Sequence, residues 1–282
     1  MRIAIIGHGN IGHFVIRSVK NYPDMECIGW YRHDEIGSVL LSKPDCTLLC
    51  TPSRQTPDLV QQLLSRGICT VDSFDIHEKI VSVRSELMPI AVSHSAVAII
   101  AAGWDPGSDS VVRAMMRAML PQATLYTNFG PGRSMGHSVA VKAIPGVKDA
   151  VSITLPVGQG RHKRHVYVEL EPNASLQQVT EAIKGDKYFV NDETEVEVVG
   201  SIKDVDTLRH GVLIEASWSG SDDGKQEIKF SMDITNPLLT AQVMLSAARA
   251  TGHLHPGVYT MIEIPPICYL PDEAEKSIRD TV

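Results

Sequence analysis

The hexapeptide at residues 7–12, Gly-His-Gly-Asn-Ile-Gly, constrains the fold of this chain more than any other feature. It follows a β-branched apolar run at residues 2–6, and it opens a segment at 10–22 whose apolar side chains recur at helical spacing. A strand, a GxGxxG turn and a helix in this order are typical of a dinucleotide-binding βαβ unit. The glycines allow a tight turn and a close approach of backbone to a pyrophosphate at the helix N-terminus. The alternative is a glycine-rich turn without a ligand.

The same alternation of strand and helix signals continues over the first hundred residues. Strands are expected at 25–31, 45–51, 68–74 and 97–103, and helices at 56–67 and 78–93. In the first of these helices, Thr56 is the expected N-cap and Gly67 the expected end. The pattern predicts an α/β fold with a Rossmann-type, doubly wound parallel sheet.

After a helix expected at 108–120 the pattern changes to strands, several of which alternate polar and apolar residues. These strands are expected at 123–130, 149–157, 164–171, 193–201, 211–220 and 226–234, with a helix at 175–185 and a tight turn at 219–226. They predict a second, α+β domain with a mostly antiparallel sheet. A strong helix at 236–252 follows, with Asn236 as N-cap and Pro237 in its first turn. We expect a dinucleotide-binding domain at 1–118, a substrate-binding domain at 119–237, and a segment at 238–282 that packs back on the first domain.

Composition narrows the possible partners and the compartment. The net charge of −7 over 282 residues argues against a nucleic acid or an anionic membrane as partner. No apolar run reaches the roughly 18 residues that span a bilayer, and the N-terminal segment does not resemble a signal peptide. The five cysteines are an odd number without a CxxC pair, which favours free thiols in a reducing cytoplasm. No Cys/His cluster indicates a metal site.

The end of the second predicted strand bears on the choice of cofactor. NAD-binding domains place an Asp or Glu there on the ribose 2′-hydroxyl, whereas an arginine accommodates the 2′-phosphate of NADP. This chain has Arg32 and His33, followed by Asp34 and Glu35, so we predict NADP, with NAD as the alternative. Arg32 as an ordinary surface residue is the competing interpretation. The expected cofactor-binding residues are Gly7, Gly9, Asn10, Ile11, Gly12, Arg32, His33, Thr51, Pro52 and Ser53.

Two carboxylates follow strands of the predicted parallel sheet. Asp75 ends the stretch VDSFD, and Asp105 lies in GWDPG after an apolar strand. Ligands bind outside the carboxyl ends of such strands, so both can face one crevice beside a nicotinamide. A carboxylate next to a tryptophan at the end of an apolar strand is costly without a cation, and two of them suit an ammonium group. The alternative is that either one caps the following helix.

The second domain carries a basic cluster, Arg-His-Lys-Arg-His at 161–165, between two predicted strands. Such a cluster is usually a solvated turn, although an arginine there is also what a substrate carboxylate needs for bidentate binding. His210 and Asn236 precede a strand and a helix, and alone they suggest a satisfied polar group and an N-cap.

Taken in order, the stretches GHGNIG, TVDSFD, GWDPG, FGPGRSMGHS, IPGVKDAVSITLP, HKRH and ITNPLLTAQ resemble the meso-diaminopimelate dehydrogenases over essentially the whole chain. The resemblance implies an oxidoreductase of lysine and amino-acid biosynthesis that works as a homodimer. It implies NADP-dependent, reversible oxidative deamination of the D-centre of meso-2,6-diaminopimelate to L-2-amino-6-oxopimelate and ammonia.

The resemblance also implies roles for particular residues. Asp75 and Asp105 would hold the D-centre ammonium beside Trp104. Thr154, Arg164 and His210 would hold the D-centre carboxylate. The remaining substrate contacts would be Asn236 and the backbone near Met135 and Gly136 at the distal L-centre, with Phe129 in the substrate pocket.

Two departures from the longer members of this family bear on specificity. Only GQGR lies between TLPV and HKRH, so the chain resembles a shorter branch whose members accept simpler D-amino acids or 2-keto acids. His33 stands where longer members carry a second arginine, which bears on how strictly NADP is preferred. The rival functions are an NADP-dependent reductase of a cyclic imine such as dihydrodipicolinate and a non-enzymatic dinucleotide sensor.

Overall fold

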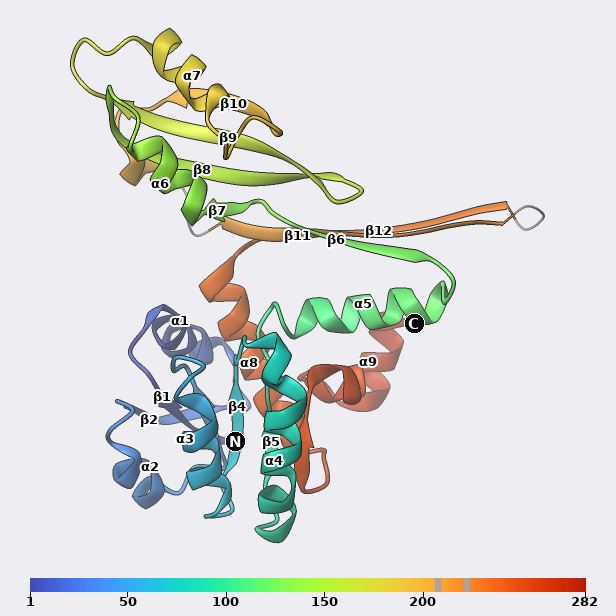
Figure 1. The fold of residues 1–282 in the computed structure, drawn as a ribbon. Helices are drawn as coiled ribbons and strands as arrows, with labels where there is room; N and C mark the ends of the chain where they lie inside the picture. Colours follow the sequence, from blue (N-terminus) through green and yellow to red (C-terminus); the bar gives the residue numbers. More distant parts are fainter. Residues whose placement is uncertain (206–208, 221–223) are drawn as a thin grey trace. The chain divides into compact units, whose positions relative to one another are not determined.

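The structure is a computed structural model that describes residues 1–205, 209–220 and 224–282. It divides into two compact units (Figure 1). Unit 1 comprises Met1–Ala114 and Pro237–Val282, and unit 2 comprises Met115–Asn236. Among the described residues, no helix is long and apolar enough to cross a membrane, and no cluster of His, Cys, Asp and Glu suits a metal ion.

Unit 1 contains a six-stranded parallel sheet, which confirms the predicted Rossmann-type sheet. Its strands, in spatial order, are β13 (Gly257–Tyr259), β5 (Val97–Ile99), β4 (Cys69–Asp72), β3 (Cys46–Leu49), β1 (Arg2–Ile6) and β2 (Glu26–Tyr31). The outer strand β13 was not predicted, because three residues are too few to show a periodicity. It pairs with β5 and so brings the C-terminal segment onto the first half of the chain.

Helices cover both faces of this sheet because alternate residues of its strands point to opposite sides. Ile3 and Ile5 of β1 pack in one core with residues of α1 and α8, whereas Ala4 and Ile6 pack in another with residues of α3 and α4. The helices of unit 1 are α1 (Asn10–Ser18), α2 (Ile36–Ser42), α3 (Thr56–Leu64), α4 (Ile80–Ser93), α8 (Asn236–Thr251) and α9 (Ala274–Thr281), and α5 (Ser108–Met119) begins in unit 1 and ends in unit 2. Short 3₁₀ turns lie at Val19–Asn21, His77–Lys79, Met261–Glu263 and Pro266–Tyr269.

Two predicted N-caps, Thr56 and Asn236, are wrong by a residue, because Asn236 is already the first residue of α8. The N-cap of α3 is Gln55, and Thr56, the predicted cap, is already helical. The hydroxyl of Thr56 donates to the carbonyl of Pro52 instead of capping the helix.

Unit 2 is built from two sheets rather than one. A four-stranded sheet has the order β10 (Glu193–Val198), β9 (Arg161–Leu170), β8 (Val147–Gly158) and β7 (Gly132–Ser134), and a three-stranded sheet has the order β12 (Gly224–Thr235), β11 (Arg209–Gly220) and β6 (Thr124–Phe129). Pairing is antiparallel except between β9 and β10, where α7 (Leu176–Gly185) forms the crossover that a parallel pair requires. The mostly antiparallel prediction is therefore confirmed.

The remaining elements of unit 2 are α6 (Met135–Lys142) and a 3₁₀ turn at Ile202–Asp204. Side chains of α6 and α7 pack with β8 and β9 around the fully buried Ile183 and the almost fully buried Phe189. The tight turn predicted at 219–226 lies partly outside the described residues, while Gly220 and Gly224 on either side of the gap are paired across β11 and β12.

Candidate active site

The three glycines of the loop between β1 and α1 have different surroundings. A Cβ on Gly7, whose φ is +116°, would overlap the carbonyl of Cys50, and a Cβ on Gly12 would overlap the carbonyl of Gly7. Among the described residues, nothing lies within 4 Å of a Cβ built on Gly9. The first and third glycines are therefore required by packing, while the second leaves an open backbone face. A pyrophosphate loop needs this division of roles.

The loop is held in place from the neighbouring strand β2. The amide of Gly7 donates to the carbonyl of Tyr31 at 2.9 Å, and the indole N–H of Trp30 donates to the carbonyl of Gly7 at 2.8 Å. Arg32 follows β2 directly, and its side chain is 65% exposed, with Nε 3.4 Å from Asp34 Oδ1. An ion pair between two exposed side chains contributes little, so Asp34 does not withhold Arg32 from a phosphate group.

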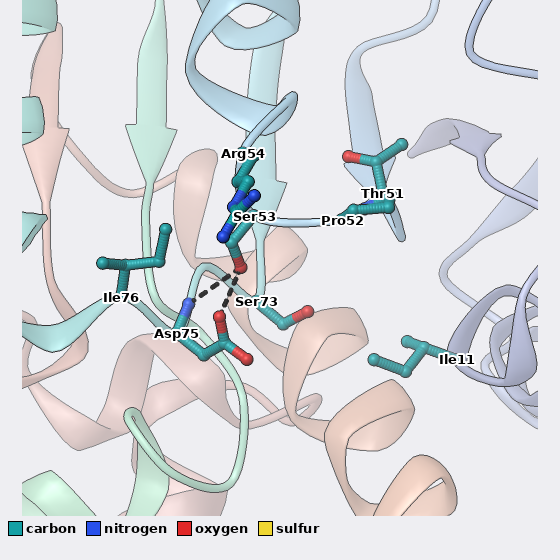
Figure 2. A pocket seen from close by; sticks show the side chains of 8 residues that line it. All are labelled: Ile11, Thr51, Pro52, Ser53, Arg54, Ser73, Asp75 and Ile76. Atoms are coloured by element: carbon teal, nitrogen blue, oxygen red, sulfur yellow. Dashed lines mark hydrogen bonds between the residues drawn. The ribbon is translucent and has the colours of Figure 1, made fainter.

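A cavity of about 420 Å³ adjoins this loop at the carboxyl ends of the central strands (Figure 2). It brings together residues from the α1 N-terminus and from the segments that follow β3 and β4. The lining residues are Ile11, Thr51, Pro52, Ser53, Arg54, Ser73, Asp75 and Ile76. Four predicted cofactor residues therefore share one cavity with one of the two predicted carboxylates. Arg54 also lines it, although the sequence analysis did not single it out.

Asp75 is exposed and is tied to Ser53 by two hydrogen bonds (Figure 2). The Ser53 hydroxyl donates to Asp75 Oδ1 at 2.6 Å, and the Asp75 amide donates to Ser53 Oγ at 3.2 Å. The next helical turn begins at His77, and its N-cap is Ile76 without a side-chain hydrogen bond. The helix-cap alternative for Asp75 is therefore wrong, and its carboxylate lies at the cavity.

Asp105 already has a cationic partner within its own segment. Its side chain is 13% exposed, and its Oδ1 accepts a hydrogen bond from Arg113 Nη2 at 3.2 Å. The same nitrogen lies 2.8 Å from Oδ2 of the fully buried Asp109. Trp104 beside Asp105 is 7% exposed. The sequence analysis missed Arg113, although the spacing of four residues between Asp109 and Arg113 on a predicted helix is a signal for such a pair.

Asp72 is a further buried carboxyl group at this edge of the sheet. Its Oδ1 accepts the backbone N–H groups of Phe74 at 2.9 Å and Ala101 at 3.0 Å, so it joins the ends of β4 and β5. Burial raises the pKa of Asp72 to about 6, and the two hydrogen bonds offset only part of this shift. Asp72 was not predicted as a site residue, although it lies in the same VDSFD stretch as Asp75.

In unit 2, Arg164 and Thr154 face each other across β9 and β8. Arg164 Nη1 donates to Thr154 Oγ1, and Nε donates to Asp192 Oδ2 at 2.6 Å. The turn of this hairpin lies between Gly158 and Arg161, and the Arg164 side chain is only 13% exposed. The solvated-turn alternative is therefore wrong for Arg164. Asp192, which orients the guanidinium group, lies far from it in the sequence and was not predicted.

Gly132 connects this pair to His210. It is paired with Thr154 across β7 and β8, and a Cβ built on it would lie 3.4 Å from the imidazole of His210. Thr154, Arg164 and His210, the three residues predicted to bind the substrate carboxylate, therefore lie near one another on strands of unit 2. Phe129 ends β6 and is 44% exposed. The other predicted substrate residues begin helices: Met135 and Gly136 begin α6, and Asn236 begins α8.

His137 is a neighbour of Arg164 that the sequence analysis missed. Its Nδ1 lies 2.8 Å from Ser134 Oγ, and its ring contacts Tyr188 and Phe189 edge-on. Partial burial and the positive charge of Arg164 lower the pKa of His137, which keeps the imidazole neutral at pH 7. Arg164 therefore faces a neutral ring as well as the Asp192 carboxylate.

A family model, a curated relative and two solved structures point to one family. Residues 103–236 match the model of the diaminopimelic acid dehydrogenase C-terminal domain. The chain is 46% identical to the meso-diaminopimelate D-dehydrogenase of Bacteroides fragilis, over all of this chain and 99% of that protein. Its structure resembles that of C. glutamicum DAP dehydrogenase in complex with DAP, with a TM-score of 0.75, 26% identity and coverage of 100% and 99%. It also resembles an engineered D-amino acid dehydrogenase bound to NADP⁺, with a TM-score of 0.72, 25% identity and the same coverage.

Proposed function

The chain belongs to the diaminopimelate dehydrogenase family, and on this premise we propose that it catalyses the NADP-dependent, reversible oxidative deamination of the D-centre of meso-2,6-diaminopimelate. The products are L-2-amino-6-oxopimelate and ammonia. The observation that carries the proposal is the 46% identity to a meso-diaminopimelate D-dehydrogenase, which extends over the whole of this chain.

Unit 1 is the cofactor domain in this proposal. The open backbone face at Gly9 and the start of α1 would hold the pyrophosphate, and the exposed Arg32 would bind the 2′-phosphate. The remaining assigned contacts are Gly7, Asn10, Ile11, Gly12, His33, Thr51, Pro52 and Ser53. When bound, NADP supplies the hydride acceptor. The relative bound to NADP⁺ supports this choice of cofactor.

Two carboxylates of unit 1 would act on the amino group that reacts. Asp75 and Asp105 are placed after neighbouring strands, and they would stabilise the ammonium group and then the cationic iminium. One of them would take a proton from the water that adds to the C=N bond, after which C–N cleavage releases ammonia. Asp75 is suited to the proton transfer because it is exposed to water and Ser53 orients its carboxylate.

Unit 2 would hold the carboxylate of the D-centre and the part of the substrate that is remote from it. Arg164, oriented by Asp192 and paired with Thr154, would bind the D-centre carboxylate together with His210. Fixing the orientation of a reacting group in this way contributes on the order of several kcal/mol to lowering a barrier. Trp104 of unit 1 is assigned beside the two carboxylates, and the assigned contacts to the rest of the substrate are Phe129, Met135, Gly136 and Asn236.

Reductive amination of simpler 2-keto acids to D-amino acids is the second candidate activity. It is supported by the short GQGR connection in this chain and by the similarity to an engineered D-amino acid dehydrogenase. A homodimer formed through unit 2 and a cytoplasmic location remain predictions.

A spectrophotometric assay tests the proposal. We expect NADP reduction with meso-diaminopimelate but not with its L,L isomer, and ammonium-dependent NADPH oxidation in the reverse direction. Simple D-amino acids in the same assay measure the second activity. NADPH oxidation without ammonium on dihydrodipicolinate would indicate the imine reductase instead, and NADP binding without turnover of any amine would indicate a sensor.

A further inference from the structure

Arg113 is shared between two carboxylates, and this sharing affects the charge that Asp105 can offer a substrate. One nitrogen, Nη2, lies 3.2 Å from Asp105 Oδ1 and 2.8 Å from Asp109 Oδ2. Ser110 fixes the arrangement, because its Oγ donates to Asp109 Oδ1 at 3.3 Å and accepts from Arg113 Nη2 at 3.3 Å. Asp109 itself is fully buried.

The net charge of these three groups depends on a proton at Asp109. With Asp109 protonated, Arg113 and Asp105 form a neutral ion pair, which attracts an ammonium group only weakly. With Asp109 ionised, Arg113 is neutralised from the buried side and the triad carries one negative charge. That charge resides mainly on Asp105, the more exposed of the two carboxylates.

We propose that Asp109 is a positioning residue that neutralises Arg113 and thereby makes the carboxylate of Asp105 available to the substrate ammonium. The inference rests on the proposed function, since it assigns the ammonium to Asp105. It also answers the question that the sequence raised about this carboxylate. The cation next to Asp105 in the structure is Arg113, and Asp109 compensates it.

Asp109 is able to change its charge near neutral pH. Its pKa is raised to about 7, mainly by burial and also by the charge and hydrogen bonding of the nearby Asp105, while Arg113 and Ser110 offset part of the shift. Side chains near the adjoining turn include Ser73 after β4 and Thr240 of α8, which would lie 3.6 and 3.7 Å from a Cβ built on Gly103, and neither carries a charge.

Asp72 is the titratable group that the β4 end contributes to this segment. It is engaged by the N–H groups of Phe74 and Ala101, and burial raises its pKa to about 6. Neither of these partners belongs to the Arg113 triad.

Two consequences follow for binding. The KM for diaminopimelate falls as pH rises through about 7, because Asp109 ionises in this range. Conversely, a bound ammonium favours ionised Asp109, so substrate binding near pH 7 releases a proton. Because the cation is present in both the ground state and the transition state, the effect is on KM more than on kcat.

Variants that change the net charge of the triad test the inference. At pH 8 the triad carries a charge of −1 in the parent, 0 in D109N and −1 in D109N/R113Q, and R113Q keeps at least one negative charge. We expect D109N to raise the KM about tenfold at pH 8, to the value that the parent shows near pH 6, and to lose the pH dependence. R113Q and the double variant should keep a KM near that of the parent. A merely structural role would instead make every variant worse and the double variant worst.

A second readout is independent of turnover. Binding of meso-diaminopimelate to the NADPH complex, which cannot accept hydride, is followed at pH 7 with a pH indicator in weak buffer. The parent should release a proton, and D109N should release none. The matched control is D272N, which removes an exposed ion pair of the same spacing with Lys276 and should behave like the parent.

The outcomes separate the two proposals. A parent enzyme that turns over no amine refutes the proposed function. If the parent is active and D109N has the same KM and the same pH dependence, the role of Asp109 is refuted and the proposed function stands. A double variant with a higher KM than D109N also refutes the role of Asp109.

Discussion

Replacement of Asp72 by asparagine tests how the ionisation of this buried carboxyl group affects the stability of unit 1. Both backbone N–H groups, from Phe74 and Ala101, donate to the same atom, Oδ1. An asparagine keeps that acceptor and removes the ionisation. The variant therefore changes the charge of a fully buried group while the connection between β4 and β5 is preserved.

The size of the effect follows from the pKa. A carboxyl group whose pKa is raised in the folded state binds its proton more tightly there than in the unfolded chain, so stability falls as pH rises from about 4 to about 6. The rise from 3.8 to about 6 corresponds to about 3 kcal/mol, at 1.36 kcal/mol per pKa unit. We expect the free energy of unfolding of D72N, relative to the parent, to increase by up to about 3 kcal/mol between pH 4 and pH 7.

Urea unfolding at several pH values measures this difference. In a W218F background the remaining tryptophans, Trp30 and Trp104, both lie in unit 1, so their fluorescence reports that unit alone. Other titrations are common to both proteins and cancel in the difference. Parallel stability curves for D72N and the parent would refute the argument, because they would show that Asp72 does not titrate in this range.

Three further predictions concern the assigned binding groups. G9A should weaken NADPH binding about tenfold with little change in stability, which a fluorescence titration measures. G12A should destabilise the protein by about 1–3 kcal/mol, because its Cβ would overlap the Gly7 carbonyl, and thermal unfolding measures this loss. D105A should lower kcat/KM far more than it lowers NADPH affinity, and an unchanged kcat/KM would contradict the role of Asp105. R164M should raise the substrate KM at least about thirtyfold, because it removes a largely buried guanidinium from a carboxylate; saturation kinetics matching the parent would show that Arg164 does not bind substrate.

Much of the fold could be predicted from the sequence because hydrophobic periodicity reports local structure. The alternating strands and helices of residues 1–103 predicted the parallel sheet, and the turn at 7–12 predicted the loop beside its first strand. The division of unit 2 into two sheets was not predicted, because periodicity does not say which strands pair. Strand β13 was too short to show a pattern.

The candidate site was predictable to the extent that its residues occupy strand ends or known motifs. The sequence predicted Asp75, Asp105 and Arg164 as site residues. In the structure, Asp75 lines a cavity, Asp105 forms an ion pair with Arg113, and Arg164 donates a hydrogen bond to Thr154 on the neighbouring strand. Their partners Ser53, Asp192 and Arg113 were not recognised in these roles. Each partner lies between 8 and 28 residues away in the sequence, where no local periodicity connects the two.

The sequence by itself determined which backbone elements form and which residue types stand at the ends of the parallel strands, because both depend on short-range patterns of polarity, glycine and proline. Only the tertiary structure decided the charges that those residues experience. Asp105 illustrates the difference: the sequence indicated a carboxylate in need of a cation, and the fold placed Arg113 beside it and the buried Asp109 behind. Electrostatic energies depend on distance and burial, and both are settled only when the chain is packed.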